Sequence, residues 1–173
     1  MSSDWSKNLT QDVLLSRGLT RDDVPALVEA FSAESFKSNK PPFAQRRETD
    51  AEEVTKRVTN ASADDFIFAV RETHGKNVVG AIYMTRRGDS GIWFDLGYWL
   101  RDAFAGKGIM TMALKAALEH ASSVRDVSGI MSDIIVANKS SQRIMSKVGF
   151  RFLETMSRKV IFPRAPDHRL RRR

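Results

Sequence analysis

The stretch GYWLRDAFAGKGIMTMALKAALEHA, residues 97–121, decides the fold because it changes from strand to helix through a glycine-bearing loop. Its first residues end an apolar run that predicts a strand over 92–100. Its last thirteen residues have helical spacing of apolar side chains and predict a helix over 109–121. Between them lies AGKGIMT, residues 105–111, whose glycines let consecutive backbone N–H groups point into one concavity at the positive end of the helix. Such a concavity suits a diphosphate.

The loop by itself does not prove a phosphate site. It is not a Walker A loop, which needs the pattern G-x-x-x-x-G-K-[ST], and it lacks the third glycine of a dinucleotide-binding fingerprint. Lys107 adds a formal positive charge beside the two glycines. A tight turn without a ligand explains Gly106 and Gly108 equally well, so both interpretations stay open at this level.

Taken over the whole chain, the sequence predicts an α/β protein with its elements in the order βααβββαβαββ. A helix that ends near Ser32 has Pro25 in its first turn, which makes Asp22 or Asp23 its expected cap. A basic loop is expected over 33–47. The further strands are expected at 13–17, 66–70, 78–84 and 130–137, the further helices at 49–60 and 140–148, and a closing hairpin at 150–162.

Composition restricts the class of protein. The chain has 173 residues, 42% hydrophobic and 28% charged, which is typical of one globular domain. It has no cysteine, which excludes a disulfide framework, a cysteine nucleophile and a thiolate metal site. The three histidines have no metal-ligand spacing, so we expect no metal. The longest apolar run, Val78 to Met84, is too short to cross a membrane, and the polar N-terminus has no signal-peptide core. We therefore expect a cytoplasmic protein.

The net charge of +7 is concentrated at the C-terminus. Residues 163–173, PRAPDHRLRRR, contain five Arg and one Asp and thus contribute +4 of it. We therefore divide the chain into one domain, 1–162, and a basic tail, 163–173. Such a tail is either a solvated, flexible end or an electrostatic contact for RNA, the ribosome or another polyanion.

A second motif supports the first. Residues 138–152 read NKSSQRIMSKVGFRF, with N-x-x-S before a helix that closes on Gly-Phe. Together with the Gly-Tyr-Trp-Leu strand and the G-K-G-I/M loop, this motif resembles the GNAT acetyltransferase superfamily, and most of all its RimJ/RimL-type ribosomal-protein N-acetyltransferases. The resemblance covers residues 13–162. It implies a mixed, mostly antiparallel sheet flanked by helices and splayed at its central strands, those over 92–100 and 130–137.

The resemblance also implies that acetyl-CoA binds in the splayed gap, as the acetyl donor. The pantetheine arm would pair with the backbone of Tyr98, Trp99 and Leu100, and the side-chain amide of Asn138 would reach it. The pyrophosphate would take the N–H groups of Ala105, Gly106, Lys107, Gly108, Ile109, Met110 and Thr111. Arg143 either adds charge near the phosphates or is a solvated helix residue. Ala105 departs from the Gln or Arg that usually begins the superfamily's loop, which removes one side-chain contact and leaves the backbone donors.

Acetyl transfer to an amine needs one proton removed from the ammonium and one supplied to the departing thiolate. Many GNAT enzymes supply it from a tyrosine seven residues after the asparagine, where this chain has Met145. The branch instead offers Ser141, whose alternative role is that of a helix cap. Asp95 and Glu154 are candidate bases, although each could equally be a surface carboxylate, with water and backbone carbonyls accepting the proton.

The resemblance thus implies an N-acetyltransferase that acts on a primary amine, with a protein N-terminus as the preferred acceptor. A small amine, such as a polyamine, an amino sugar or an amino acid, is the alternative acceptor. Met145 and the arginine tail would also fit a non-catalytic acyl-CoA-binding or RNA-associated protein. The chain is expected to be a monomer or a homodimer.

Overall fold

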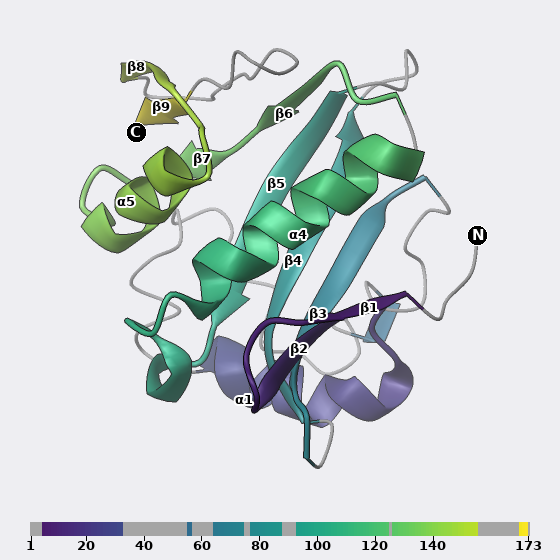
Figure 1. The fold of residues 1–173 in the computed structure, drawn as a ribbon. Coiled ribbons are helices and arrows are strands. Elements are labelled where there is room, and N and C mark those ends of the chain that lie inside the picture. Colours follow the sequence, from purple (N-terminus) through teal and green to yellow (C-terminus); the bar gives the residue numbers. More distant parts are fainter. Residues whose placement is uncertain are drawn as a thin grey trace.

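A six-stranded sheet in the order β1-β2-β3-β4-β5-β6 forms the centre of the computed structural model (Figure 1). The structure describes residues 5–32, 55–56, 64–74, 77–87, 93–124, 126–155 and 170–172. Its strands are β1 (Ser6–Asn8), β2 (Val13–Arg17), β3 (Phe66–Glu72), β4 (Val78–Arg87), β5 (Trp93–Leu100) and β6 (Gly129–Met131). The first five strands pair antiparallel, and β6 pairs with β5 in parallel. The mixed, mostly antiparallel sheet expected from the sequence is confirmed, with β1 as a strand that the sequence pattern did not reveal.

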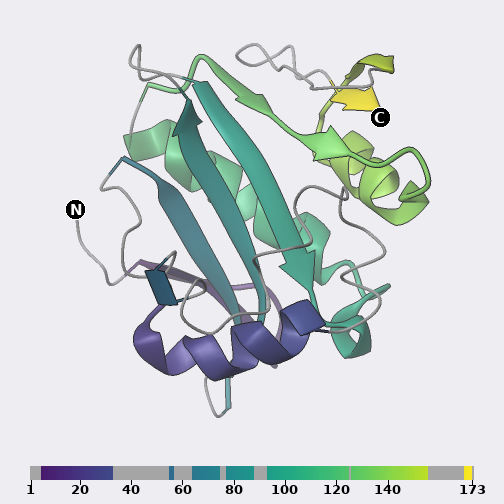
Figure 2. The ribbon, with the colours of Figure 1, turned by 180° about the vertical axis from the view of Figure 1, so that it is seen from behind.

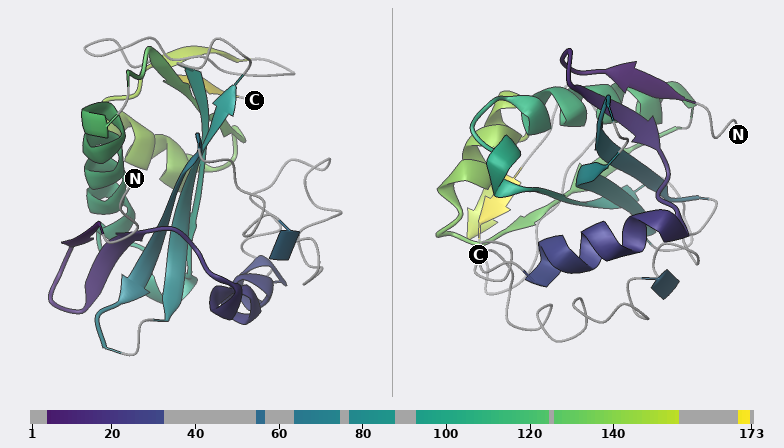
Figure 3. Two further views of the ribbon diagram at one scale, coloured as in Figure 1. Left: turned by 90° about the vertical axis from the view of Figure 1, so that its right-hand side faces the viewer. Right: turned by 90° about the horizontal axis from the view of Figure 1, so that it is seen from below.

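Helices cover both faces of this sheet. Helix α4 (Ile109–Val124) lies on one face and α1 (Val24–Ser32) on the other, so the sheet stands between them in Figure 3. Successive strand residues point to opposite faces, and β3 shows the consequence. Phe68 is buried in the cluster that contains α4, whereas its neighbour Ala69 is buried in the cluster that contains α1. Each face therefore has its own hydrophobic core.

The expected strand over 130–137 is divided. β6 ends at Met131, Ser132 is buried outside any strand, and β7 (Asp133–Ile134) joins a second sheet in the order β7-β9-β8. β8 (Phe152–Thr155) and β9 (Leu170–Arg172) complete that sheet. A run of apolar residues predicts burial, but it does not tell which neighbouring strand each residue pairs with. The predicted single strand was wrong for this reason.

The C-terminal strand β9 belongs to the expected tail. Leu170 is paired with Phe152 of β8, and Arg171 with Asp133 of β7, both in parallel. These three residues are thus hydrogen-bonded backbone rather than a free end. The basic loop over 33–47 and the second strand of the expected closing hairpin, 157–162, lie outside the described residues, as does the expected helix over 49–60 except for the helical residues Thr55 and Lys56.

The start of α1 differs from the expected cap. Thr20 precedes a short 3-10 turn, Arg21–Asp23, that continues into α1, and Asp23 reaches back to Thr20. The Thr20 backbone N–H and hydroxyl both donate to Asp23 Oδ2, at 2.7 and 3.1 Å. Asp23 therefore closes a capping box with Thr20 at its start, and Asp22 does not cap the helix. Pro25 lies in the first turn of α1, as expected.

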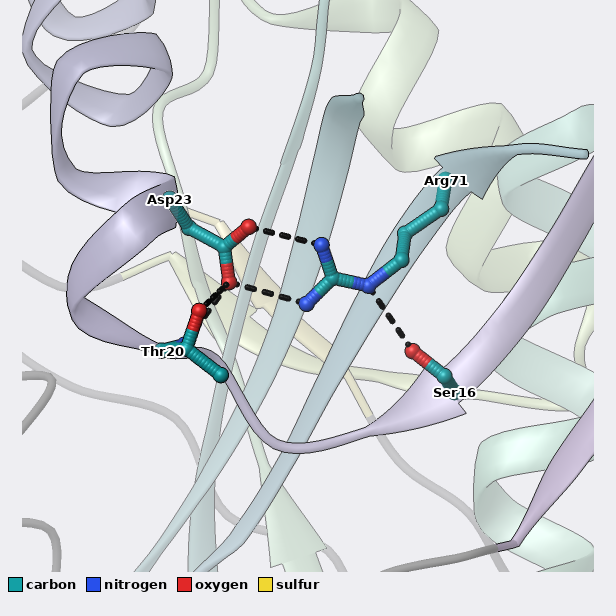
Figure 4. Close-up of polar contacts among 4 residues, drawn as sticks. All are labelled: Ser16, Thr20, Asp23 and Arg71. Atoms are coloured by element: carbon teal, nitrogen blue, oxygen red, sulfur yellow. Dashed lines mark hydrogen bonds and ion pairs between the residues drawn. The ribbon is translucent and has the colours of Figure 1, made fainter. Parts of the chain in front are cut away.

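Asp23 also joins α1 to the sheet (Figure 4). The Arg71 guanidinium of β3 donates to both Asp23 carboxylate oxygens, at 2.6 and 2.8 Å, and to the Ser16 hydroxyl of β2, at 3.1 Å. Asp23 is only 7% exposed. Burial alone would raise the pKa of the Asp23 carboxyl, but the hydrogen bonds from Arg71 and Thr20 outweigh burial and lower that pKa below its ordinary value.

Among the described residues, no helix has both the length and the apolar character that a membrane span requires.

We expect Asp23→Asn to lower the free energy of unfolding by about 3 kcal/mol, because it leaves the Arg71 charge without its counter-ion in a largely buried place. Glu119→Gln, which removes the exposed ion pair between Lys7 and Glu119, is the matched control and should cost less than about 1 kcal/mol. Denaturant unfolding measures both.

Acidification provides a second check of the same ion pair. Because the native pKa of Asp23 is lowered, its contribution is complete above the unfolded-state pKa of roughly 3.9 and is lost as the pH falls through the native value. The parent should therefore lose part of its stability below that pH, and Asp23→Asn should lose less. Equal losses would show that Asp23 is not held ionised by Arg71.

Candidate active site

A cavity of about 440 Å³ opens between the second half of β5 and helix α5 (Lys139–Lys147), with the start of α4 at one end. The cavity exists because β6 pairs with only the first part of β5. β5 pairs with β4 from end to end, but with β6 only through Trp93, Phe94 and Asp95. Figure 2 shows β5 and the β6–β7 segment diverging beyond this point. Among the described residues no strand pairs with the β6-side edge of 96–100, so its backbone groups are left for a ligand.

On its other edge, this end of β5 packs closely against Gly80 of β4. A Cβ on Gly80 of β4 would lie 2.7 Å from the Trp99 carbonyl oxygen and 2.8 Å from Leu100 Cδ1. Contacts this short do not occur, so a side chain at position 80 would push β4 and β5 apart. The Arg101 backbone N–H continues the contact by donating to the Val79 carbonyl, at 2.8 Å.

The glycine loop leads directly into α4 through two glycines with positive φ. Gly106 and Gly108 have φ of 74° and 78°, values that L side chains rarely adopt. The Gly108 carbonyl accepts from the Met112 N–H at 3.1 Å, so α4 begins immediately after Gly108. The first N–H groups of an α-helix have no acceptor within it, and those of Ile109, Met110 and Thr111 stand at the cavity, which these residues line.

Two residues of the loop differ from the expectation. Ala105 lines the cavity, but its N–H donates to the Asp102 carbonyl at 2.9 Å and is therefore already used. Lys107 is exposed and does not line the cavity, and its Nζ lies 5.5 Å from the centroid of the Phe104 ring. Arg143, by contrast, lines the cavity from α5.

Tyr98 and Trp99, the two aromatic residues near the end of β5, point to opposite faces of the sheet. Trp99 is 7% exposed and packs edge-on against Phe31 of α1, with ring centroids 5.6 Å apart. It is thus a core side chain, and only its backbone is at the free edge of β5. Tyr98 and Leu100 pack on the α4 side, where the Tyr98 hydroxyl meets α5.

Asn138 is the N-cap of α5. Its Oδ1 accepts from the Ser141 N–H at 3.0 Å and from the Ser140 hydroxyl at 3.1 Å. The cap reading of Ser141 is therefore wrong, because Asn138 performs that role. With Oδ1 engaged in the cap, the Nδ2 group of Asn138 is the part of its amide left to contact a ligand.

The Ser141 hydroxyl lies within hydrogen-bond distance of another hydroxyl. Its Oγ is 2.5 Å from the Tyr98 hydroxyl oxygen, across the cavity from β5. Burial raises the pKa of Tyr98 to about 12, against a smaller lowering by its hydrogen bond with Ser141. Tyr98 therefore stays protonated at physiological pH. The sequence predicts pairing of the Tyr98 backbone with the donor but no contact between its hydroxyl and Ser141; a hydroxyl in the apolar stretch 96–100 was the signal for a side-chain role.

The remaining candidates lie elsewhere. Met145 is completely buried, so it is a core residue of α5. Asp95 is exposed, on the face of β5 that also carries Trp99, and does not line the cavity. Glu154 is in β8, and its side chain lies outside the described residues. No group of three His, Cys, Asp or Glu side chains in the described part of the chain is arranged to hold a metal.

Comparisons with known proteins agree with this geometry. The family model described as an acetyltransferase (GNAT) domain matches residues 14–151. No curated protein matches the chain.

Solved structures share the fold. The ribosomal-protein-S5-alanine acetyltransferase of Vibrio fischeri superposes with a TM-score of 0.70 at 18% identity, over 85% of this chain and 83% of that one. The ribosomal L7/L12 alpha-N-protein acetyltransferase RimL, in complex with coenzyme A, has a TM-score of 0.71 at 19% identity, over 84% of both chains. The microcin C7 self-immunity acetyltransferase MccE, in complex with acetyl-CoA and AMP, has a TM-score of 0.66 at 16% identity, over 82% and 80%. At such identities the likeness shows the fold alone.

We expect coenzyme A to raise the melting temperature of the parent and to leave that of Gly108→Glu unchanged, because the new carboxylate would face the phosphates in the concavity at α4. Gly18→Glu is the matched control. Gly18 has a φ of 77° directly after β2 and does not line the cavity, so the strain is similar while binding is retained. Thermal unfolding with and without coenzyme A measures the shift, and an equal shift in both variants would contradict this position for the phosphates.

Proposed function

Because the chain belongs to the GNAT acetyltransferase family, and is therefore an acetyl-CoA-dependent acetyltransferase, we propose that its acceptor is the α-amine of a protein N-terminus. The observation that carries the catalytic part is the cavity itself. It combines an edge of β5 with which no described strand pairs, the N–H groups in the first turn of α4, which have no acceptor within the helix, and a hydroxyl at the start of α5. An extended, amide-containing arm that ends in a diphosphate needs the first two together.

We assign the donor-binding roles accordingly. The backbone of Tyr98, Trp99 and Leu100 would hold the amide-containing arm along the free edge of β5. The N–H groups from Gly106 to Thr111 would hold the pyrophosphate, and Asn138 and Arg143 line the cavity from the α5 side. The bound donor supplies an acetyl group activated as a thioester.

Ser141 is the residue that we assign to the leaving sulfur. Its hydroxyl lines the cavity at the N-terminus of α5, where the positive end of the helix also favours negative charge. Its backbone is held by Asn138 rather than by its own side chain, so the hydroxyl is not used for capping. Met145, at the position where many GNAT enzymes have a tyrosine, is a buried core residue of α5 and cannot donate a proton, so the hydroxyl of Ser141 takes that place in the proposal.

The candidate bases, which would accept the proton of the attacking amine, are Asp95 and Glu154. Asp95 is on the α1 face of β5 and outside the cavity, so its role would run through an intervening water molecule. Glu154 stays a second candidate. Proximity to a bound thioester supplies much of the rate advantage in such a site, and water can then accept the proton of the amine.

The choice of acceptor rests on the resemblance in sequence. The strand Gly97–Leu100, the G-K-G-I loop and N-x-x-S at Asn138 together have the pattern of the ribosomal-protein N-acetyltransferases. The Vibrio fischeri enzyme and RimL carry such names, and MccE shows that the same fold serves another function. A small amine is therefore the alternative acceptor.

We expect Ser141→Ala to lower kcat about 100-fold with little change in the KM for acetyl-CoA, because its interaction grows only as charge develops on sulfur. Ser140→Ala is the matched control. It removes the neighbouring hydroxyl, which donates to Asn138, and should cost some stability while kcat is retained. A kcat of Ser141→Ala within threefold of the parent would remove Ser141 from the mechanism and leave water as the proton source.

We expect peptides with a free N-terminus to be acetylated with a kcat/KM at least tenfold above that of spermidine, glucosamine or free amino acids. A peptide of the same sequence with a blocked N-terminus and an internal lysine should not react, since the ε-amine is presented on a different backbone. Thiol release measures all of them in one assay. Preference for a small amine would establish the alternative acceptor, and no thiol release with any amine would favour a binding protein.

A further inference from the structure

We propose that Tyr98 is a positioning residue for catalysis, whose hydroxyl donates to Ser141 Oγ and thereby directs the proton of Ser141 into the cavity. The inference rests on the proposed role of Ser141. It adds a residue whose side chain the sequence motifs do not assign, and it couples the two walls of the cavity, β5 and α5.

The geometry fixes both partners of this hydrogen bond. The two hydroxyl oxygens are 2.5 Å apart, and the Tyr98 oxygen is also 3.4 Å from the Ser141 carbonyl. Tyr98 is held by the pairing of β5 with β4, where it lies opposite Ile82. Ser141 is held by the Asn138 cap, through its backbone N–H. The backbones that carry the two hydroxyls are therefore both held in place.

The direction of donation follows from acidity. A phenol is a stronger acid than an aliphatic alcohol and hence the better donor. Burial raises the pKa of Tyr98 to about 12, so the phenol keeps its proton at any pH at which the enzyme works. A serine hydroxyl has one proton and two lone pairs. When a lone pair accepts from Tyr98, the serine proton is left for another acceptor within the cavity.

The protons balance along this chain of hydroxyls. As the C–S bond of the thioester breaks, its electron pair goes to sulfur, and Ser141 donates to the charge that develops there. A proton that passes from Ser141 Oγ to sulfur is returned to Ser141 by solvent, while the Tyr98 hydroxyl keeps its own proton and its hydrogen bond to Oγ. The proton lost by the attacking amine balances the one that sulfur gains.

The first test is Tyr98→Phe, which removes the hydroxyl and keeps the ring. We expect kcat to fall about tenfold, less than for Ser141→Ala because the serine proton is still present. The KM for acetyl-CoA should stay within twofold, because the backbone of β5 is unchanged. Tyr83→Phe is the matched control, since Tyr83 packs against the α1-side cluster and does not line the cavity, and its kcat should be retained. A KM rise without loss of kcat would overturn the inference.

A double-mutant cycle separates this inference from the proposed function. In the Ser141→Ala background, Tyr98→Phe should change kcat less than twofold, because its effect acts through Ser141. If Ser141→Ala keeps the parent kcat, the role proposed for Ser141 fails and the inference fails with it. If Ser141→Ala is slow and Tyr98→Phe lowers kcat a further tenfold, Ser141 keeps its role and the positioning role of Tyr98 is overturned.

The hydrogen bond is also measurable without donor or acceptor. Denaturation midpoints of the two single variants and the double variant form a second cycle. We expect the double variant to unfold near the midpoint of the less stable single variant, since one bond is lost only once. Additive shifts would show that the two hydroxyls do not interact in solution, and would overturn the inference independently of activity.

Discussion

The partial pairing of β5 is the constraint on which the rest of the site depends. Backbone N–H and C=O groups inside a protein need partners, and the edge of β5 beyond Asp95 has none from a neighbouring strand among the described residues. The chain leaves β5 after Met131, passes through the buried Ser132 and joins the second sheet at β7. This departure opens the cavity and provides one wall of it. A ligand with amide groups can supply the missing partners, which a compact hydrophobic molecule cannot.

The other wall is set by the start of α5. Asn138 ends the turn after β7, and its side chain satisfies the Ser141 N–H. That single hydrogen bond fixes the first turn of the helix and leaves the Ser141 hydroxyl for Tyr98. The Tyr98 and Ser141 hydroxyls thus join the two walls of the cavity, β5 and α5. The glycine loop closes one end, because Gly106 and Gly108 adopt backbone angles that place the first N–H groups of α4 there.

The opposite face of the sheet stabilises this arrangement. Asp23 and Arg71 join the start of α1 to β3, and the Phe31 ring at the other end of α1 packs against Trp99. Trp99 is anchored on that face, and this anchoring holds the backbone of β5 in place while Tyr98 turns to the cavity. The polar contact at the start of α1 therefore holds β3, and the aromatic contact at its end holds β5, both on the face of the sheet that α1 covers.

The sequence by itself determined the features that depend on neighbours along the chain. Apolar runs located the central strands, the glycines located the loop before α4, and N-x-x-S located the start of α5. Tertiary structure decided what depends on partners distant in sequence. It divided the expected strand at Ser132, placed a 3-10 turn with a Thr20–Asp23 capping box before α1, used Asn138 to cap α5 and placed Asp95 outside the cavity. It also brought together Tyr98 and Ser141, which are 43 residues apart. The physical reason is that periodicity reports whether a side chain is buried, whereas strand pairing and hydrogen-bond partners depend on which segments the fold places side by side.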